Sequence, residues 1–229
     1  MESVYESVHD VRDHCRGDRL EGCLVQKADL SVLDFSGYTV DRVAFKSVGL
    51  SGVRFGKSLV LGSSFTGARL RGASFQGARF RGANVTPSEL IEVNFQDAYI
   101  EQSKFFDSTM SSTRFQGAHV LGCRFGGADL AVANFERATI MHTVFSDSRM
   151  VNAQMSGASF RRAVLVDVDL QHANLYGADF RDALLVKVDL RDANLMNAKF
   201  EGAEIVDVAL DRADLDEVTK NFLAGRRTR

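Results

Sequence analysis

One apolar residue recurs at every fifth position of this chain, from Leu20 to Leu215, without a miss and without a shift of frame. The forty residues in this frame are all Leu, Phe, Val, Ile or Met. A period of five matches neither the 3.6-residue period of an α-helix nor the two-residue period of a β-strand. It requires a backbone that turns a corner every five residues, as in a solenoid of short repeats.

Each five-residue unit has two positions that face inward. We call the repeating apolar residue the core position and the residue two places before it the small position, which is usually Ala, Val or Ser, as in Ala73 and Ala158. Residues two apart on an extended backbone point to the same side. The residue two places after the core position, the corner position, is Gly throughout a run from 62 to 82, where a tight turn needs the backbone freedom of glycine.

Core residues twenty apart are alike, and this likeness gives the length of one coil. One column is aliphatic without β-branching, and another is aromatic through its first six members. The columns begin with Leu30, Leu50, Leu70 and Leu90 and with Phe35, Phe55, Phe75 and Phe95. A spacing of fifteen mixes the two kinds. We therefore predict a four-sided coil of twenty residues, with Phe75 stacked between Phe55 and Phe95. About ten such coils make a rod about 48 Å long at a strand spacing of about 4.8 Å.

Segments such as residues 73–77 (Ala-Ser-Phe-Gln-Gly) and 178–182 (Ala-Asp-Phe-Arg-Asp) resemble the pentapeptide-repeat family. The family pattern is a small residue, Asp or Asn, Leu or Phe, a polar residue and then any residue. The resemblance extends over residues 20–215. It implies an all-β solenoid, a right-handed quadrilateral β-helix of about ten 20-residue coils with short helical caps, which agrees with the column pattern.

Both ends of the chain carry a segment outside the repeat frame, and such segments can cover the open strand edges of a rod. Residues 1–19 are predicted to form an N-terminal capping helix, because four apolar residues have helical spacing. These are Val4, Val8, Val11 and Cys15. Residues 216–229 are predicted to form a short C-terminal helix, ended by Gly225, and a disordered basic tail.

The charge and the cysteines indicate a cytoplasmic protein. A net charge of −2 gives no general attraction to nucleic acid or to an anionic membrane, so we expect neither as a direct partner. Three cysteines do not make a disulfide framework, and Cys23 and Cys123 occupy the small position, as core residues in a reducing compartment would. The acidic N-terminus and the lack of a long apolar run argue against a signal peptide and a membrane span.

No set of residues predicts catalysis, a cofactor or a metal site. Residues 56–58 (Gly-Lys-Ser) resemble the end of a phosphate-binding loop, but Ser51 stands where that motif requires its first glycine. His119 and Cys123 have the spacing of a metal-binding pair only on a helix, and Cys123 is expected to face inward. A regular rod also offers no cleft that could hold a reaction. We therefore expect that the protein is not an enzyme.

A ridge of outward apolar residues is predicted near the C-terminal end. Its members follow core residues at intervals of twenty, and an aligned set of this kind indicates an interface. The C-terminal helix of the same chain or a second copy in a homodimer could cover it. Topoisomerase-protecting members of the family dimerise through their C-terminal ends, and this resemblance favours the homodimer. The predicted interface comprises Val166, Val186, Val206, Leu184, Phe222 and Leu223.

Residues 163–217 carry 13 acidic side chains against 5 basic ones. Over about 13 Å of rod, this net charge has about the density of duplex DNA, which carries about one charge per 1.7 Å. The predicted partner-binding residues are Asp169, Asp189, Asp192, Asp207 and Asp211. A solvated exterior without a partner is the alternative. A belt of eight Lys and Arg residues between Arg42 and Arg81 opposes a uniformly anionic rod.

The resemblance implies a function in the quinolone- and albicidin-resistance groups of the family. Their members are non-enzymatic, DNA-mimic-like proteins that bind DNA gyrase or topoisomerase IV and protect it from topoisomerase poisons. The unbroken frame of this chain leaves out the projecting loops of many quinolone-resistance members. The alternative function is an interaction scaffold or a secreted effector that binds another protein or an anionic surface.

Overall fold

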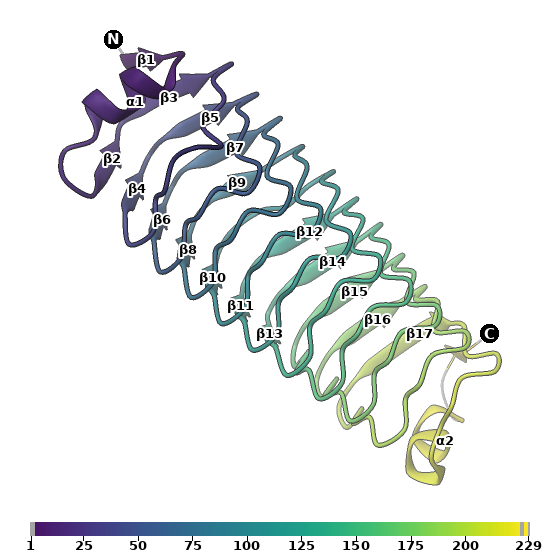
Figure 1. The fold of residues 1–229 in the computed structure, drawn as a ribbon. Helices are drawn as coiled ribbons and strands as arrows, with labels where there is room; N and C mark the ends of the chain where they lie inside the picture. Colours follow the sequence, from purple (N-terminus) through teal and green to yellow (C-terminus); the bar gives the residue numbers. More distant parts are fainter. Residues whose placement is uncertain (1–2, 225–226, 229) are drawn as a thin grey trace.

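The computed structural model describes residues 3–224 and 227–228. The chain winds into a rod of about ten stacked coils, with the N-terminal segment at one end and the C-terminal segment at the other (Figure 1). Parallel strands of two to five residues form three sheets along two sides of the rod. On the other two sides, neighbouring coils are joined mainly by single β-bridges, such as Gly49 with Arg69 and Ser74 with Asn94.

The strands of each sheet come from successive coils. The seven-stranded sheet contains β2 (Arg19–Glu21), β4 (Thr39–Asp41), β6 (Leu59–Leu61), β8 (Arg79–Arg81), β10 (Tyr99–Glu101), β11 (His119–Leu121) and β13 (Thr139–Met141). The five-stranded sheet contains β1 (Ser3–Tyr5), β3 (Cys23–Gln26), β5 (Ala44–Lys46), β7 (Ser64–Thr66) and β9 (Asn84–Val85). The six-stranded sheet contains β12 (Arg124–Gly126), β14 (Val144–Ser146), β15 (Val164–Val166), β16 (Leu184–Val186), β17 (Glu204–Val208) and β18 (Arg227–Thr228).

The register confirms the twenty-residue coil. Val40 pairs with Val60, and Phe80 with Ile100. Every core-position residue from Leu20 to Ile205 is buried. The ring of Phe75 lies between those of Phe55 and Phe95, at centroid distances of 4.6 and 5.2 Å and within 12° of parallel, as predicted. Each coil therefore buries its apolar residues against the like residues of the coils on either side.

The corner positions depend less on glycine than the sequence pattern suggested. Gly62 has a positive φ of 50°, but so do Lys57 at 56° and Asp192 at 59°. Side chains with a Cβ rarely adopt this left-handed conformation. Here hydrogen bonds between coils support it, since the Lys57 N–H donates to the Gln76 carbonyl at 2.9 Å. The corner geometry is therefore imposed by stacking and not by glycine alone.

Proline interrupts one side of the rod. Pro87 occupies a corner position, and its ring holds φ near −65°, so it cannot adopt the left-handed turn of its neighbours in the column, Gly67 and Asp107. Strand β9, just before it, has only two residues, and the next coil contributes only the single bridging residue Lys104 before β12 begins. The five- and six-stranded sheets therefore lie on one side of the rod, separated at this point.

The N-terminal segment covers the first coil with a strand and a helix. Strand β1 pairs with β3, and helix α1 (Val8–His14) inserts Val11 into the end of the core. Ser7 caps the helix, because its hydroxyl accepts the Asp10 N–H while the Asp10 carboxylate accepts the Ser7 N–H. The expectation of one helix that includes Val4 was wrong. Val4 lies in β1, where pairing with the open edge of β3 competes successfully with helix formation.

The C-terminal segment also divides into a helix and a strand. Helix α2 (Glu217–Leu223) begins at its cap Asp216, whose carboxylate accepts the N–H groups of Thr219 at 2.8 Å and Asn197 at 2.6 Å. The expectation of a disordered tail was wrong for residues 227–228, which form β18 against β17. The open edge of β17 offers backbone groups that this short strand can satisfy. Arg226 and Arg229 lie outside the described residues.

Candidate functional site

Three of the five predicted acidic residues line one hollow on the C-terminal coils. Asp189, Asp207 and Asp211 surround a space of about 440 Å³ beside the six-stranded sheet. Asp169 bridges to Asp189 in the coil-to-coil ladder, one step toward the N-terminus. Asp192 is not among the residues that line the hollow. The fold thus brings most of the predicted acidic residues onto neighbouring coils.

Basic side chains neutralise part of this acidic surface. Arg191 donates to Asp189, with Nε 2.9 Å from Oδ1, and Arg212 donates to Asp192, with Nε 2.6 Å from Oδ1. These hydrogen bonds lower the pKa values of Asp189 and Asp192, so both carboxylates stay ionised. The positive charge of the paired arginine balances each of them. Among residues 3–224, Asp211 takes part in no ion pair. The surface is therefore a mixed pattern of acids and bases with a net excess of acids.

The valine ridge is present in the predicted register. Val166, Val186 and Val206 pair with one another in strands β15, β16 and β17, and all three side chains are half-buried. Leu184, also half-buried, lies at the other end of β16 and pairs with Val164. The backbone of Arg227 in β18 pairs with Val206. The ridge therefore runs along one side of the rod, and its last member borders β18.

Phe222 and Leu223 lie on a different part of the last coil. The ring of Phe222 packs against that of Phe200, with centroids 6.1 Å apart, and Leu223 is buried in the end of the core. The outward apolar residue of α2 is Val218, which is 74% exposed and was not among the predicted interface residues. The six predicted residues thus do not form one continuous surface.

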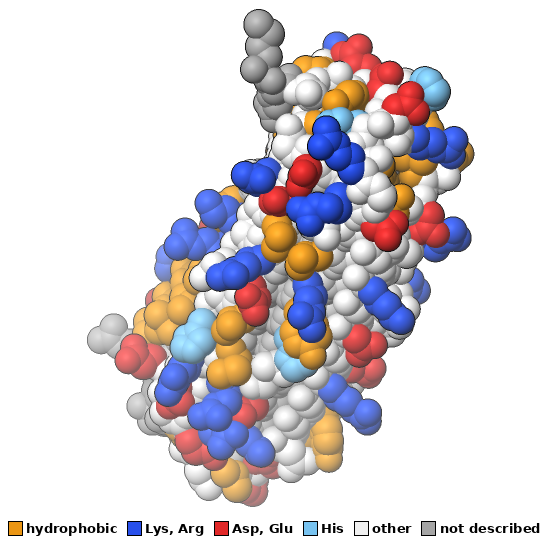
Figure 2. Space-filling model, turned by 90° about the vertical axis from the view of Figure 1, so that its left-hand side faces the viewer, with side chains coloured by type: hydrophobic (Ala, Val, Ile, Leu, Met, Phe, Trp, Pro, Cys, Tyr) orange, Lys and Arg blue, Asp and Glu red, His pale blue; other side chains and the backbone are white. Residues whose placement is uncertain are grey.

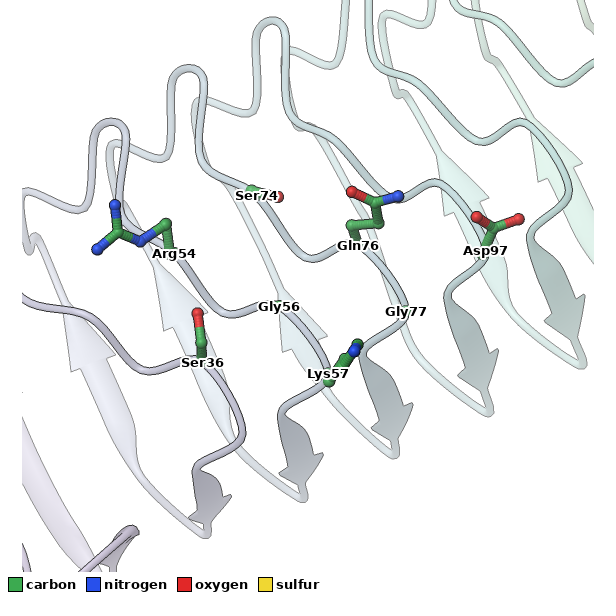
Figure 3. Close-up of a pocket in the computed structure, with 8 residues that line it drawn as sticks. All are labelled: Ser36, Arg54, Gly56, Lys57, Ser74, Gln76, Gly77 and Asp97. Atoms are coloured by element: carbon green, nitrogen blue, oxygen red, sulfur yellow. The ribbon is translucent and has the colours of Figure 1, made fainter.

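The segment that resembles a phosphate-binding loop is an ordinary corner of the rod. Gly56 and Lys57 border a hollow of about 590 Å³ whose lining residues come from four successive coils (Figure 3). Ser58 is buried, and the segment continues into strand β6 instead of a helix. Arg54, the other cation of this hollow, is held by Asp34, with Nη2 2.7 Å from Oδ2. The geometry lacks the helix N-terminus that a phosphate-binding loop requires.

His119 and Cys123 point in opposite directions. His119 is exposed on strand β11, whereas Cys123 is buried and its thiol donates to the Ile100 carbonyl, with Sγ 3.3 Å from the oxygen. Burial raises the pKa of Cys123 to about 11. Within the described ranges 3–224 and 227–228, no group of three His, Cys, Asp or Glu side chains could hold a metal ion. The same part of the chain contains no helix that is long and apolar enough to cross a membrane.

The outer face of the seven-stranded sheet carries exposed aromatic and apolar side chains that sequence reasoning missed. Tyr99 is 45% exposed and stacks on His119. The signal was available, because Tyr99 and His119 both precede a core residue and lie twenty apart. Apolar and basic side chains intermingle on this face (Figure 2).

Comparisons with known proteins agree with this architecture. A family model described as pentapeptide repeats matches eight copies, within residues 50–86, 108–147, 144–182, 163–202 and 178–217. No curated protein sequence matches the chain significantly. HetL, a pentapeptide repeat protein involved in heterocyst differentiation regulation from the cyanobacterium Nostoc sp. strain PCC 7120, is similar in structure. It is 21% identical, with 86% of each chain covered and a TM-score of 0.78.

A second solved structure is QnrB1, a plasmid-mediated fluoroquinolone resistance protein. It is 18% identical over 98% of this chain and 95% of its own, with a TM-score of 0.47. The predicted right-handed quadrilateral β-helix is confirmed by the likeness to HetL and by the parallel solenoid itself. Because the repeat model matches well over half of its length, this chain belongs to the pentapeptide-repeat family.

Proposed function

We propose that this protein is a non-enzymatic, protein-binding rod that protects a type II topoisomerase, DNA gyrase or topoisomerase IV, from topoisomerase poisons. The observation that carries the proposal is the acidic surface of residues 163–217. There Asp169 and Asp189 stack in the ladder, and Asp207 and Asp211 join Asp189 around one hollow. An anionic rod of this kind can occupy the cationic path along which such an enzyme receives DNA.

Charge density supports the proposal in quantitative terms. The net charge of −8 in residues 163–217 is spread over about 13 Å of rod at the ladder spacing. Duplex DNA carries about one charge per 1.7 Å, which is a similar density. The ion pairs of Asp189 and Asp192 reduce the field close to the surface but leave the net charge unchanged. We therefore expect complementarity with a cationic groove to act mainly through the total charge and to be strongly salt-dependent.

The experiment is a supercoiling assay and a drug-induced DNA cleavage assay with gyrase from the same host, with this protein titrated in. We expect reduced cleavage-complex formation, which weakens as salt rises. A triple variant, Asp169→Lys with Asp189→Lys and Asp192→Lys, should lose most of this effect. The control, Arg69→Glu with Arg71→Glu, also changes surface charge but lies outside the acidic coils and should retain it. If neither assay responds at a large molar excess of the wild-type protein, the topoisomerase proposal is wrong.

The alternative, an interaction scaffold or effector without a topoisomerase target, is favoured by one specific observation. The pairing of Asp189 with Arg191, and of Asp192 with Arg212, breaks the acidic coils into local acid–base pairs. A continuous anionic face would resemble DNA more closely. A pull-down from host lysate separates the two functions, because enrichment of gyrase or topoisomerase IV subunits is expected only from the protector.

A further inference from the structure

Two neighbouring hollows lie on the outer face of the seven-stranded sheet. One hollow of about 510 Å³ is lined by Leu59, Leu61, Arg79, Arg81, Tyr99 and Glu101. A second hollow of about 240 Å³ extends from Tyr99 and Glu101 to Leu121 and Met141. Because the two hollows share Tyr99 and Glu101, they adjoin, and together they extend over β6, β8, β10, β11 and β13. We call the two hollows together the Tyr99 groove, and Figure 2 views this side of the rod.

The ring of Tyr99 is held in place at the centre of the groove. The ring of His119 stacks on it at a centroid distance of 4.7 Å and an angle of 9°. The guanidinium carbon of Arg79 lies 5.5 Å from the Tyr99 centroid, in position for a cation–π contact. A side chain fixed in this way loses little conformational freedom when a partner binds, which makes it a preorganised anchor.

The packing around Tyr99 also discriminates between classes of ligand. Proteins that bind single-stranded nucleic acid stack bases on the open faces of aromatic rings. His119 covers one face of Tyr99, and Arg79 is engaged with the ring through its cation–π contact, so little open face remains for a base. The exposed part of the groove instead includes Leu121, which is 44% exposed, beside the half-buried Met141. Tyr, Met and Arg are enriched in protein–protein interfaces, so this composition fits a protein partner better.

The charges in the groove specify the chemistry of that partner. Among residues 3–224, neither Arg79 nor Arg81 forms an ion pair, and Arg81 faces Glu101 across the ladder without reaching it. The acidic residues farther along the same sheet are already compensated, since Glu21 pairs with Arg19 and Asp41 with Arg42. The groove therefore has two available guanidinium groups and one carboxylate. Carboxylates from a partner would complement it.

We propose that the Tyr99 groove docks a segment of a partner protein that combines acidic and apolar side chains. Carboxylates of the segment meet Arg79 and Arg81, and its apolar side chains pack on Leu121 and against the part of Tyr99 that His119 and Arg79 leave exposed. This surface lies on a different side of the rod from the valine ridge and the acidic hollow, and it has the opposite charge preference. It is therefore independent of the proposed topoisomerase binding and needs a second partner, or a second region of the same one.

The test is a selection of random twelve-residue peptides, displayed on phage, against the immobilised wild-type protein. We expect the selected peptides to be enriched in Asp and Glu together with Leu, Phe or other apolar residues. Fluorescence anisotropy with the selected peptides should give an affinity at least about tenfold weaker for Arg79→Glu with Arg81→Glu, and for Tyr99→Ala, as for hot-spot residues. The control, Arg69→Glu with Arg114→Glu, makes the same charge change on other sides of the rod and should bind like the wild type.

Circular dichroism on each variant verifies that the protein is folded. We expect every variant to fold, because the substituted side chains are exposed. A selection without enrichment in acidic residues, or an affinity that the groove variants do not change, would overturn the proposal. A labelled oligo-dT probe that binds the wild type and fails to bind Tyr99→Ala would overturn it in favour of a nucleic acid. Light scattering that shows self-association lost in the Arg79/Arg81 variant would overturn it in favour of a second copy as the occupant.

Discussion

The rings of Phe145 and Phe160 meet at an angle of 60° with their centroids 6.3 Å apart. At this point the aromatic part of the core changes sides. Toward the N-terminus, Phe125 stacks on Phe145, whereas toward the C-terminus the stack continues from Phe160 to Phe180 and Phe200. Centroids within these stacks are 4.9 to 5.1 Å apart, and the rings are nearly parallel. The tilted contact lets aromatic packing continue along the rod although the phenylalanine column moves to another side.

Substitution of a phenylalanine in the middle of the stacked core should strongly destabilise the protein. Phe75→Asp should prevent folding, because an unpaired carboxylate would be buried between two rings at a cost of several kcal/mol. Phe75→Leu keeps an apolar side chain and should fold with a lower melting temperature. Gln76→Asp, on the exposed neighbour, is the matched control and should melt like the wild type. Thermal unfolding followed by circular dichroism measures all three, and a Phe75→Asp variant with the wild-type melting temperature would contradict the stacked core.

Two buried serines should respond differently to the same substitution. The Ser63 hydroxyl accepts the Val43 N–H at 3.1 Å and donates to the Val40 carbonyl at 3.1 Å. Within residues 3–224, the equally buried Ser58 hydroxyl has no hydrogen-bond partner. Ser63→Ala should lower the free energy of unfolding by about 1 kcal/mol, whereas Ser58→Ala should leave it unchanged or raise it. Urea denaturation tests the pair, and an equal loss in both variants would show that the hydroxyl contacts do not decide their stability.

The coil, the core and the stacking of Phe75 were predictable from the sequence because a solenoid is almost one-dimensional. Each coil contacts mainly its two neighbours, so a repeat read along the chain gives the three-dimensional register directly. The ends were not predictable in this way. Val4 and residues 227–228 lie outside the repeat, and their conformation depends on open strand edges that exist only after the rod has formed.

The surface was predictable only in part. The columns of Val166 and of Asp169 follow from the twenty-residue coil, but the side-chain directions that join Arg212 to Asp192 do not. The Tyr99 groove was not predicted, because the outward positions compared across coils were those of the valine ridge and the acidic residues, and not those of Tyr99 and His119. Their stacking becomes evident when positions twenty apart are compared, as for the core residues.

An ion pair between coils should make stability depend on pH in the acid range. Hydrogen bonds from Arg54, together with Ser36, lower the pKa of Asp34 to about 2, from an ordinary value of about 4. Because the folded-state pKa is the lower one, the pair contributes stability above about pH 4, and this contribution is lost as the pH falls toward about 2. Both side chains are largely exposed, so the effect should be small.

Melting temperatures of the wild type and Arg54→Gln between pH 2 and pH 5 test this dependence. The difference between the two proteins should be largest at the upper end of the range and should shrink on acidification. Arg114→Gln, which removes an exposed arginine that forms no ion pair within residues 3–224, is the matched control and should show no such change. A difference that stays constant across the range would contradict the role of Asp34.

The valine ridge gives the last prediction, a homodimer in which Val166, Val186 and Val206 contact a second copy near the C-terminal end. Their stacked side chains are only half-buried in one chain, and the end of the ridge is bordered by the two-residue strand β18. Burying such a ridge between two chains would remove apolar surface from water and stabilise the pair. Replacing all three valines by Lys should therefore shift the mass measured by light scattering from dimer toward monomer.

Val132→Lys, at an isolated valine that is 54% exposed, is the control and should leave the mass unchanged. Truncation after Leu215 is less informative, because it also removes Leu223 from the end of the core. A wild-type protein that is monomeric at micromolar concentration would reject the homodimer, and a triple variant that remains dimeric while folded would exclude the ridge from its interface.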